Sequence, residues 1–225
     1  MPLLAYCIVE TAAVIEVLRT GVNSIPIESV EHGDLRCFVS QTPDTAVVPG
    51  GQIREAALTF HQVLDEVFRQ AAIIPFRFPT ILSGEAGVTA HLAKHSLEYR
   101  TALSRLRHMV QMEIRLQFKT SPPTPELAGT GGETPAKLSG IEYLQKIQAR
   151  HAKLEIAAKG FRQVCGRLTL AWKQRDSVEG VRCFALIERT AIEEFQKTLT
   201  GANIESELVA RLSGPWPATQ FLKEE

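Results

Sequence analysis

The sequence predicts an α+β protein of two domains, a ferredoxin-like N-terminal domain and a related α+β C-terminal domain with an extended C-terminal tail. Segments with the 3.6-residue period of amphipathic helices alternate with segments of the two-residue period that is typical of half-buried strands. The length of 225 residues suits one large domain or two small ones. A stretch rich in proline, glycine and threonine separates two halves with similar element patterns.

The boundaries follow from these patterns. We expect an N-terminal domain over residues 1–120, a linker over 121–137, a C-terminal domain over 138–212 and a tail over 213–225. The linker holds too few apolar residues to fold alone, so we expect it to be exposed and mobile.

The first half reads β-α-β-β-α, then a proline-rich segment, then α-β, close to a ferredoxin-like order with one extra helix. Leu3 to Val9 is apolar on both faces, as in a central strand. An apolar stripe from Ile53 to Ala71 predicts a long helix. Strict alternation from Val110 to Phe118 predicts a strand with one buried and one solvent-facing side. The other expected elements are a short helix over 11–21, strands over 25–30 and 35–40, and a long helix beginning near Ala86.

The second half reads α-β-β-α-β, which is the pattern of the first half without its opening strand. A helical stripe runs from Ile141 to Cys165, and a capping box at Thr190-Ala191-Ile192-Glu193 predicts the start of another helix. The strands expected here cover 168–172, 181–187 and 204–212.

The composition limits the classes of partner and the cellular compartment that we expect for this protein. Lys and Arg number 25 and balance 25 Asp and Glu, which argues against nucleic acid as the main partner. The sequence has neither a signal-peptide pattern nor a run of 18 apolar residues, so we expect a soluble cytosolic protein with no membrane partner. The cysteines are widely spaced among apolar neighbours, which predicts buried free thiols rather than disulfides. They are Cys7, Cys37, Cys165 and Cys183.

A proline-rich segment, Ile73 to Leu82, belongs to neither neighbouring helical pattern. Pro75 and Pro79 lack a backbone N–H, so the preceding helix must end near Ala72. We expect Phe76 and Phe78 to point to one side and Arg77 to the other. The segment then either separates two helices or offers a surface to a partner.

Arg77 has two interpretations. It can form an internal ion pair with a carboxylate such as Glu66, because a charge between two anchored aromatic residues usually needs a local counter-ion. Alternatively, Arg77 contacts an outside partner.

No pattern of catalytic residues stands out. His91 and His95 have the i, i+4 spacing of metal ligands but lack a third ligand nearby, so we expect a structural pair. His61 and Asp65 share this spacing, and a surface hydrogen bond is the expected role because nothing supplies a nucleophile. We therefore expect a protein that is not an enzyme and has no metal or cofactor.

Four stretches, in this order, resemble the gas vesicle protein F/L family. They are Leu4-Ala5-Tyr6-Cys7-Ile8-Val9, His61 followed by Ile74-Pro75-Phe76-Arg77-Phe78-Pro79-Thr80, Ser139-Gly140-Ile141-Glu142-Tyr143-Leu144, and Leu212-Ser213-Gly214-Pro215-Trp216-Pro217 with Phe221. The second and fourth are the more specific. The chain departs from the family pattern where Pro79 replaces a glycine and where Ala218-Thr219-Gln220 replaces a Pro and Tyr-Ser.

The resemblance implies a non-enzymatic accessory or minor structural protein of gas vesicle formation, located at the gas vesicle in the cytoplasm. Its implied partners are the hydrophobic major shell protein and other gas vesicle accessory proteins. We expect the first domain to bind the shell protein, because the likeness is strongest near residues 60–82. The expected partner-binding residues are Phe76, Arg77, Phe78, Pro79 and Thr80. The alternative is a small-molecule-sensing regulatory module with its ligand site between two ferredoxin-like domains.

The tail is expected to dock rather than hang free. Gly214 allows a sharp turn after the last strand, and Pro215 and Pro217 restrict the backbone around Trp216. Phe221 is expected to pin the end of the chain. The docking surface is either the sheet of the second domain or the groove between the domains.

Overall fold

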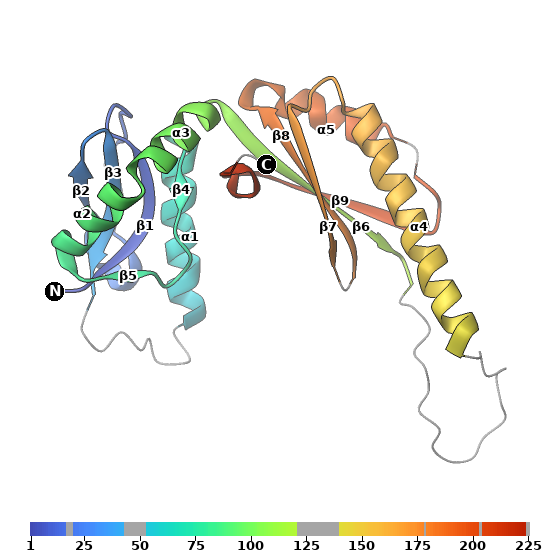
Figure 1. Ribbon diagram of the computed structural model, residues 1–225, viewed down its shortest axis with the longest axis horizontal. Coiled ribbons are helices and arrows are strands. Elements are labelled where there is room, and N and C mark those ends of the chain that lie inside the picture. Colours follow the sequence, from blue (N-terminus) through green and yellow to red (C-terminus); the bar gives the residue numbers. More distant parts are fainter. Residues whose placement is uncertain (17–19, 43–52, 121–139, 178, 203, 224–225) are drawn as a thin grey trace, which may run out of the picture. The chain divides into compact units, whose positions relative to one another are not determined.

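The computed structural model describes residues 1–16, 20–42, 53–120, 140–177, 179–202 and 204–223. The chain divides into two compact units. The first comprises Met1–Val110 with Trp216–Glu225, and the second comprises Gln111–Pro215. Each unit combines helices with a sheet (Figure 1), so the predicted α+β class is confirmed.

The first unit is built around β1, whose eight residues are almost all buried. Its sheet has the order β2-β3-β1-β4, and β5 also pairs with β1. The strands are β1 (Leu3–Glu10), β2 (Glu28–His32), β3 (Leu35–Gln41), β4 (Ile74–Pro75) and β5 (Ile81–Leu82). The helices are α1 (Ile53–Gln70), α2 (Gly84–Lys94) and α3 (Ser96–Leu106), with short 3-10 turns η1 (Val22–Ser24) and η3 (Thr219–Phe221).

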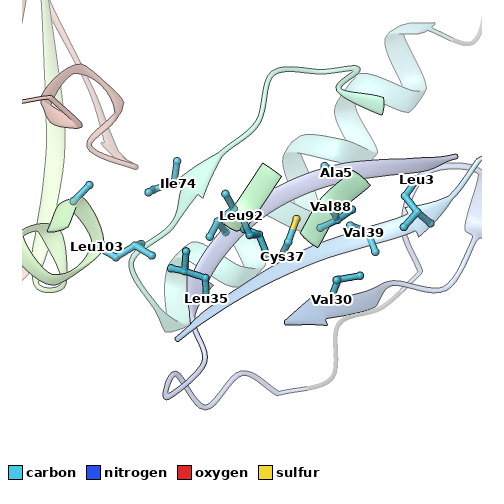
Figure 2. Packing of buried hydrophobic residues seen from close by; sticks show 12 residues of the cluster. Leu3, Ala5, Val30, Leu35, Cys37, Val39, Ile74, Val88, Leu92 and Leu103 are labelled. Carbon is cyan, nitrogen blue, oxygen red and sulfur yellow. The ribbon is translucent and has the colours of Figure 1, made fainter. Parts of the chain in front are cut away.

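Two faces of this sheet are covered by different helices. On one face, side chains of the sheet form a buried cluster with residues of α2 and α3, including Val88, Leu92 and Leu103 (Figure 2). On the other face, Tyr6 of β1 stacks on Phe60 of α1, with ring centroids 5.0 Å apart. The apolar character of β1 on both sides follows from this double cover.

Several elements of the first unit differ from the sequence prediction. Residues 11–16 are not helical, and residues 17–19 lie outside the described part of the chain, so the expected helix over 11–21 is not seen. The helix expected from Ala86 is two helices, because the backbone of His95 leaves the helical region at φ −109° and ψ 12°. The strand expected over 25–30 begins only at Glu28.

The second unit has the order β-α-β-β-α-β of a ferredoxin-like domain. Its sheet order is β7-β8-β6-β9. The elements are β6 (Met109–Phe118), α4 (Gly140–Val164), β7 (Ala171–Ser177), β8 (Gly180–Glu188), a short turn η2 (Arg189–Ala191), α5 (Ile192–Thr200) and β9 (Leu208–Trp216).

The ferredoxin-like order therefore belongs to the second unit, and the strand predicted to close the first domain instead opens this one. The alternation from Val110 to Phe118 specifies a strand but not its neighbours, which come from β8 and β9, about 60–100 residues later. This division differs from the expected domains 1–120 and 138–212. The expected linker over 121–137 lies outside the described residues.

The polar side of β6 is also less exposed than predicted. Gln111 and Glu113 are buried, as are their apolar neighbours Met112 and Ile114. Period alone identifies two faces of a strand, but only the packing decides whether the polar face meets solvent.

Candidate functional site

The segment Ile74–Leu82, which we call the proline-rich edge, is part of the first sheet. Ile74 and Pro75 pair with Ile8 and Cys7 of β1, and Ile81 and Leu82 pair with Leu4 and Leu3. The backbone N–H of Phe76 donates to the carbonyl oxygen of Tyr6 at 2.8 Å, and that of Ala5 donates to Thr80 at 2.9 Å. The segment therefore lines the sheet edge and does not wedge two helices apart.

The two aromatic residues of this edge pack against different helices. The ring of Phe76 lies 5.4 Å from His91 of α2, and the ring of Phe78 lies 5.3 Å from Phe60 of α1. The prediction that both point to one side is wrong, because β4 ends at Pro75 and the two-residue period stops there. The edge is thereby anchored to helices on both faces of the sheet.

Arg77 is exposed and, within the described part of the chain, makes no ion pair. The expected pair with Glu66 is not formed. Its carbonyl oxygen accepts a 2.7 Å hydrogen bond from the Thr80 hydroxyl, which closes the loop between β4 and β5. Pro79 is also exposed. The edge thus presents a cation and a proline ring on a firmly held backbone.

The two helical histidines belong to an aromatic cluster beside this edge. His91 Nε2 lies 2.8 Å from the Tyr99 hydroxyl, and the rings of His91 and His95 are 4.9 Å apart. Burial lowers the pKa of His91, and the nearby charges of His95 and Lys94 lower it further. Among the described residues, no group of three or more potential metal ligands gathers. These contacts favour the structural interpretation of the pair.

His61 and Asp65 are both exposed on α1. In the described coordinates no hydrogen bond joins them, and His61 instead meets the ring of Phe60 edge-on at 6.1 Å.

A polar contact that was not predicted from the sequence lies inside the same unit. The buried Tyr6 hydroxyl lies 2.9 Å from Ser40 Oγ and accepts a 2.9 Å hydrogen bond from the backbone N–H of Val22. A Cβ atom at Gly21 would come within 2.2 Å of the Tyr6 hydroxyl oxygen, so the turn before η1 needs glycine. The signal available in the sequence is a tyrosine within an otherwise apolar strand, because buried hydroxyls need partners.

A polar cleft of about 820 Å³ lies beside η1 and α1, wholly within the first unit. The small-molecule alternative places a ligand between two domains, which is a different position. The side chains at the cleft are mostly charged or hydroxylic, including Glu55, Thr59, Glu66 and Arg69.

The tail returns to the first unit. Phe221 is 2% exposed, and Arg105 of α3 donates hydrogen bonds to the carbonyl oxygens of Phe221 and Leu222. Leu222 packs against the buried cluster of Figure 2. Trp216, which was expected to dock, is 42% exposed.

The strand before this tail is longer than predicted. Gly214 and Pro215 lie inside β9, which runs on to Trp216, so the chain does not turn at Gly214. Pro217 follows the strand and accepts a 2.7 Å backbone hydrogen bond from Thr219.

All four cysteines are buried and free. Burial raises the pKa of Cys37 and of Cys183 to about 12. None is therefore suited to act as a thiolate nucleophile at neutral pH. Every helix in the described part of the chain is either too short or too polar to span a bilayer.

Comparison with known proteins agrees with the fold over its whole length. The structure is similar to the crystal structure of the gas vesicle protein GvpF from Microcystis aeruginosa, with a TM-score of 0.77 and 14% identity over 99% of each chain. It is also similar to GvpF from Anabaena sp. PCC7120, with a TM-score of 0.76 and 13% identity over 100% of this chain and 97% of that one. A search of curated proteins finds no significant match.

At such low identities, the structural likeness shows the fold alone. The family model described as gas vesicle synthesis protein GvpL/GvpF matches residues 2–223. Because this match spans nearly the whole chain, the protein belongs to the GvpL/GvpF family of gas vesicle synthesis proteins.

Proposed function

We propose that this protein is an accessory or minor structural component of gas vesicle formation that binds the hydrophobic major shell protein through its proline-rich edge. The protein acts at the gas vesicle, either in the finished vesicle or during its assembly. Its further partners are other gas vesicle accessory proteins. The family membership supports the setting. The observation that carries the choice of surface is the open, firmly anchored sheet edge formed by residues 74–82.

The backbone of this edge is available for strand addition. β4 ends the sheet order, and both β4 and β5 pair with β1 alone among the described strands. Unpaired N–H and C=O groups on an edge strand can accept an extended segment from another chain. The edge strands are short, which protects the free protein from pairing with copies of itself.

The side chains of the edge suit an apolar partner with an acidic or polar group nearby. Ile81 is 41% exposed, Pro79 is exposed, and the free Arg77 guanidinium offers five N–H donors. The contacts of Phe76 and Phe78 with the two helices fix the backbone before binding, so little further ordering is needed. A hydrophobic shell subunit that has not yet assembled exposes apolar surface that such an edge can cover.

A pull-down experiment, in which the immobilised full chain retains the shell protein, tests this proposal. We expect Ile81→Asp to lose most of the bound shell protein, and Arg77→Ala to weaken binding severalfold. The matched controls are Leu58→Asp and Arg54→Ala, which change an exposed apolar residue and an exposed arginine of α1 in the same unit. Equal retention by the edge variants and the controls would rule out the proline-rich edge as the binding surface.

A further inference from the structure

A buried carboxylate in the second unit holds two arginines together. Glu113 of β6 is 7% exposed, and its Oε1 atom accepts hydrogen bonds from Nε of Arg115 and from Nε of Arg182, each at 2.7 Å. Arg115 lies two residues further along β6, and Arg182 lies on the neighbouring β8. Because both Nε atoms bind one oxygen, the two guanidinium groups lie side by side.

Both guanidinium groups keep donors for another group. Their side chains are 56% and 41% exposed for Arg115 and Arg182, respectively. Within the described residues, only the Nε atoms of these two arginines donate hydrogen bonds. The Nη donors are therefore available, and the Arg182 group is further oriented over the ring of Phe184, 5.2 Å from its centroid.

The pair lines a small pocket. This pocket has a volume of about 260 Å³ and lies where the β7–β8 hairpin meets β6. A Cβ atom at Gly180 would come within 2.0 Å of the Leu116 carbonyl oxygen, so the glycine allows this close approach. The lining residues are Arg115, Leu116, Gln117, Ser177, Glu179, Gly180, Val181 and Arg182.

The charges around the pocket favour a singly charged anion. Arg115 and Arg182 are offset by Glu113 and by the exposed Glu179 at the pocket, so these four groups carry no net charge. The unused Nη donors can still hold one carboxylate, whereas a doubly charged ligand would leave a larger excess of negative charge. A phosphate monoester carries about −1.5 to −2 at pH 7, whereas a carboxylate carries one negative charge and matches the planar fork of an arginine.

The cationic surface continues across the sheet. Arg175 of β7 is directly opposite Arg182 in the strand register, so both side chains lie on the same face. Arg175 is exposed and makes no ion pair in the described part of the chain. Lys173, two residues earlier on β7, shares this face. The cations lie in a row beside a pocket that fits one carboxylate. This arrangement suits a polypeptide with several acidic side chains better than a single free anion.

We propose that this face of the second unit binds an acidic polypeptide segment, with one Asp or Glu carboxylate seated between Arg115 and Arg182. The site is separate in sequence from the proline-rich edge, and its occupant is a protein segment of opposite charge. Glu113 acts as the positioning residue, because it fixes both arginines without using their Nη donors.

Binding of a fluorescein-labelled hexaglutamate peptide to the full chain, followed by fluorescence anisotropy at two salt concentrations, tests the site. We expect the double variant Arg115→Gln/Arg182→Gln to bind at least tenfold more weakly. The matched control, Arg162→Gln/Arg167→Gln, removes the same charge from exposed positions of the second unit and should bind like the unchanged protein. Arg115→Lys/Arg182→Lys keeps the charge but loses the planar forks, and should remain severalfold weaker.

A single substitution away from Glu113 separates loss of binding from loss of folding. Arg175→Gln leaves the Glu113 contacts intact and should weaken peptide binding two- to threefold with an unchanged melting temperature. Equal weakening by both glutamine double variants would overturn the proposal, because it would show general charge attraction only. Unlabelled peptide should displace the labelled peptide more effectively than inorganic phosphate or an oligothymidylate does. Equal displacement by phosphate or by the oligothymidylate would overturn the assignment of an acidic polypeptide.

Discussion

The guanidinium group of Arg105 on α3 donates hydrogen bonds to the backbone carbonyl oxygens of Phe221 and Leu222 at the end of the chain. The last residues thus complete the first unit, although β9 before them belongs to the second. A chain cut after the second unit would leave the first without part of its packing.

The tail contact predicts which aromatic residue matters for stability. Phe221→Ala should lower the free energy of unfolding by about 3–5 kcal/mol, because its ring is almost fully buried. Trp216→Ala should cost less, because that side chain is 42% exposed. Chemical denaturation of the full chain measures both. A larger loss for Trp216 than for Phe221 would contradict this assignment.

The buried Tyr6 hydroxyl should stabilise the first unit. Tyr6→Phe removes a partner from Ser40 and from the Val22 N–H, and leaving buried groups unsatisfied costs about 1–3 kcal/mol. Tyr143→Phe on α4 is the control, because that hydroxyl has no hydrogen bond among the described residues. Thermal unfolding of both variants compares them. Equal melting temperatures would mean that the contact contributes nothing.

The four thiols should react only after the chain unfolds. Burial raises the pKa of Cys7 well above its usual range, and that of Cys37 and Cys183 to about 12. Thiols protonated and shielded in this way should label with Ellman's reagent only on the timescale of unfolding, with denatured protein as the control. Rapid labelling of the native chain would contradict the burial.

The same thiol pKa values predict an alkaline loss of stability. Unfolded thiols ionise near their usual pKa of 9.0, whereas the folded ones stay protonated to about 12. The unfolded state therefore loses protons first, and the contribution of these thiols is complete below pH 9 and falls as the pH rises above it. The double variant Cys37→Ala/Cys183→Ala should show a shallower decline between pH 9 and 12.

Glu113 should support stability at neutral pH and lose this effect in acid. Burial alone would raise the pKa of its carboxyl group, but hydrogen bonds from Arg182 and Arg115 outweigh burial and lower the pKa below 4.5. Its contribution is therefore present above the unfolded pKa and lost as the pH falls through the lower folded pKa.

Glu113→Gln tests this sign. It should cost about 1–3 kcal/mol at pH 7, because the hydrogen bonds to charged partners are weakened. The difference from the unchanged protein should shrink as the pH falls below 4.5 and through the lowered pKa of Glu113. Glu194→Gln, at an exposed position of α5 with no ion pair among the described residues, provides a comparison of charge alone. A constant difference at all pH values would contradict the lowered pKa.

The candidate site was partly predictable from sequence. Two prolines and two phenylalanines between helical patterns mark residues 74–82 as a distinct segment, because proline cannot continue a helix. The sequence could not show that Phe76 and Phe78 meet helices on opposite faces of a sheet, because period does not hold across an irregular loop. The sequence also could not decide whether Arg77 forms an ion pair with Glu66 or stays unpaired. In the described part of the structure the two residues form no ion pair.

The sequence by itself determined the α+β class, the central position of β1, the long helix α1 and the strand character of β6. These features depend on local periodicity and on apolar runs, which any sheet or helix must bury. Only the tertiary structure decided that β6 joins the second sheet and that Phe221 returns to the first unit. The physical reason is that strand pairing and tail docking depend on partners about 60–120 residues away, which no local pattern encodes.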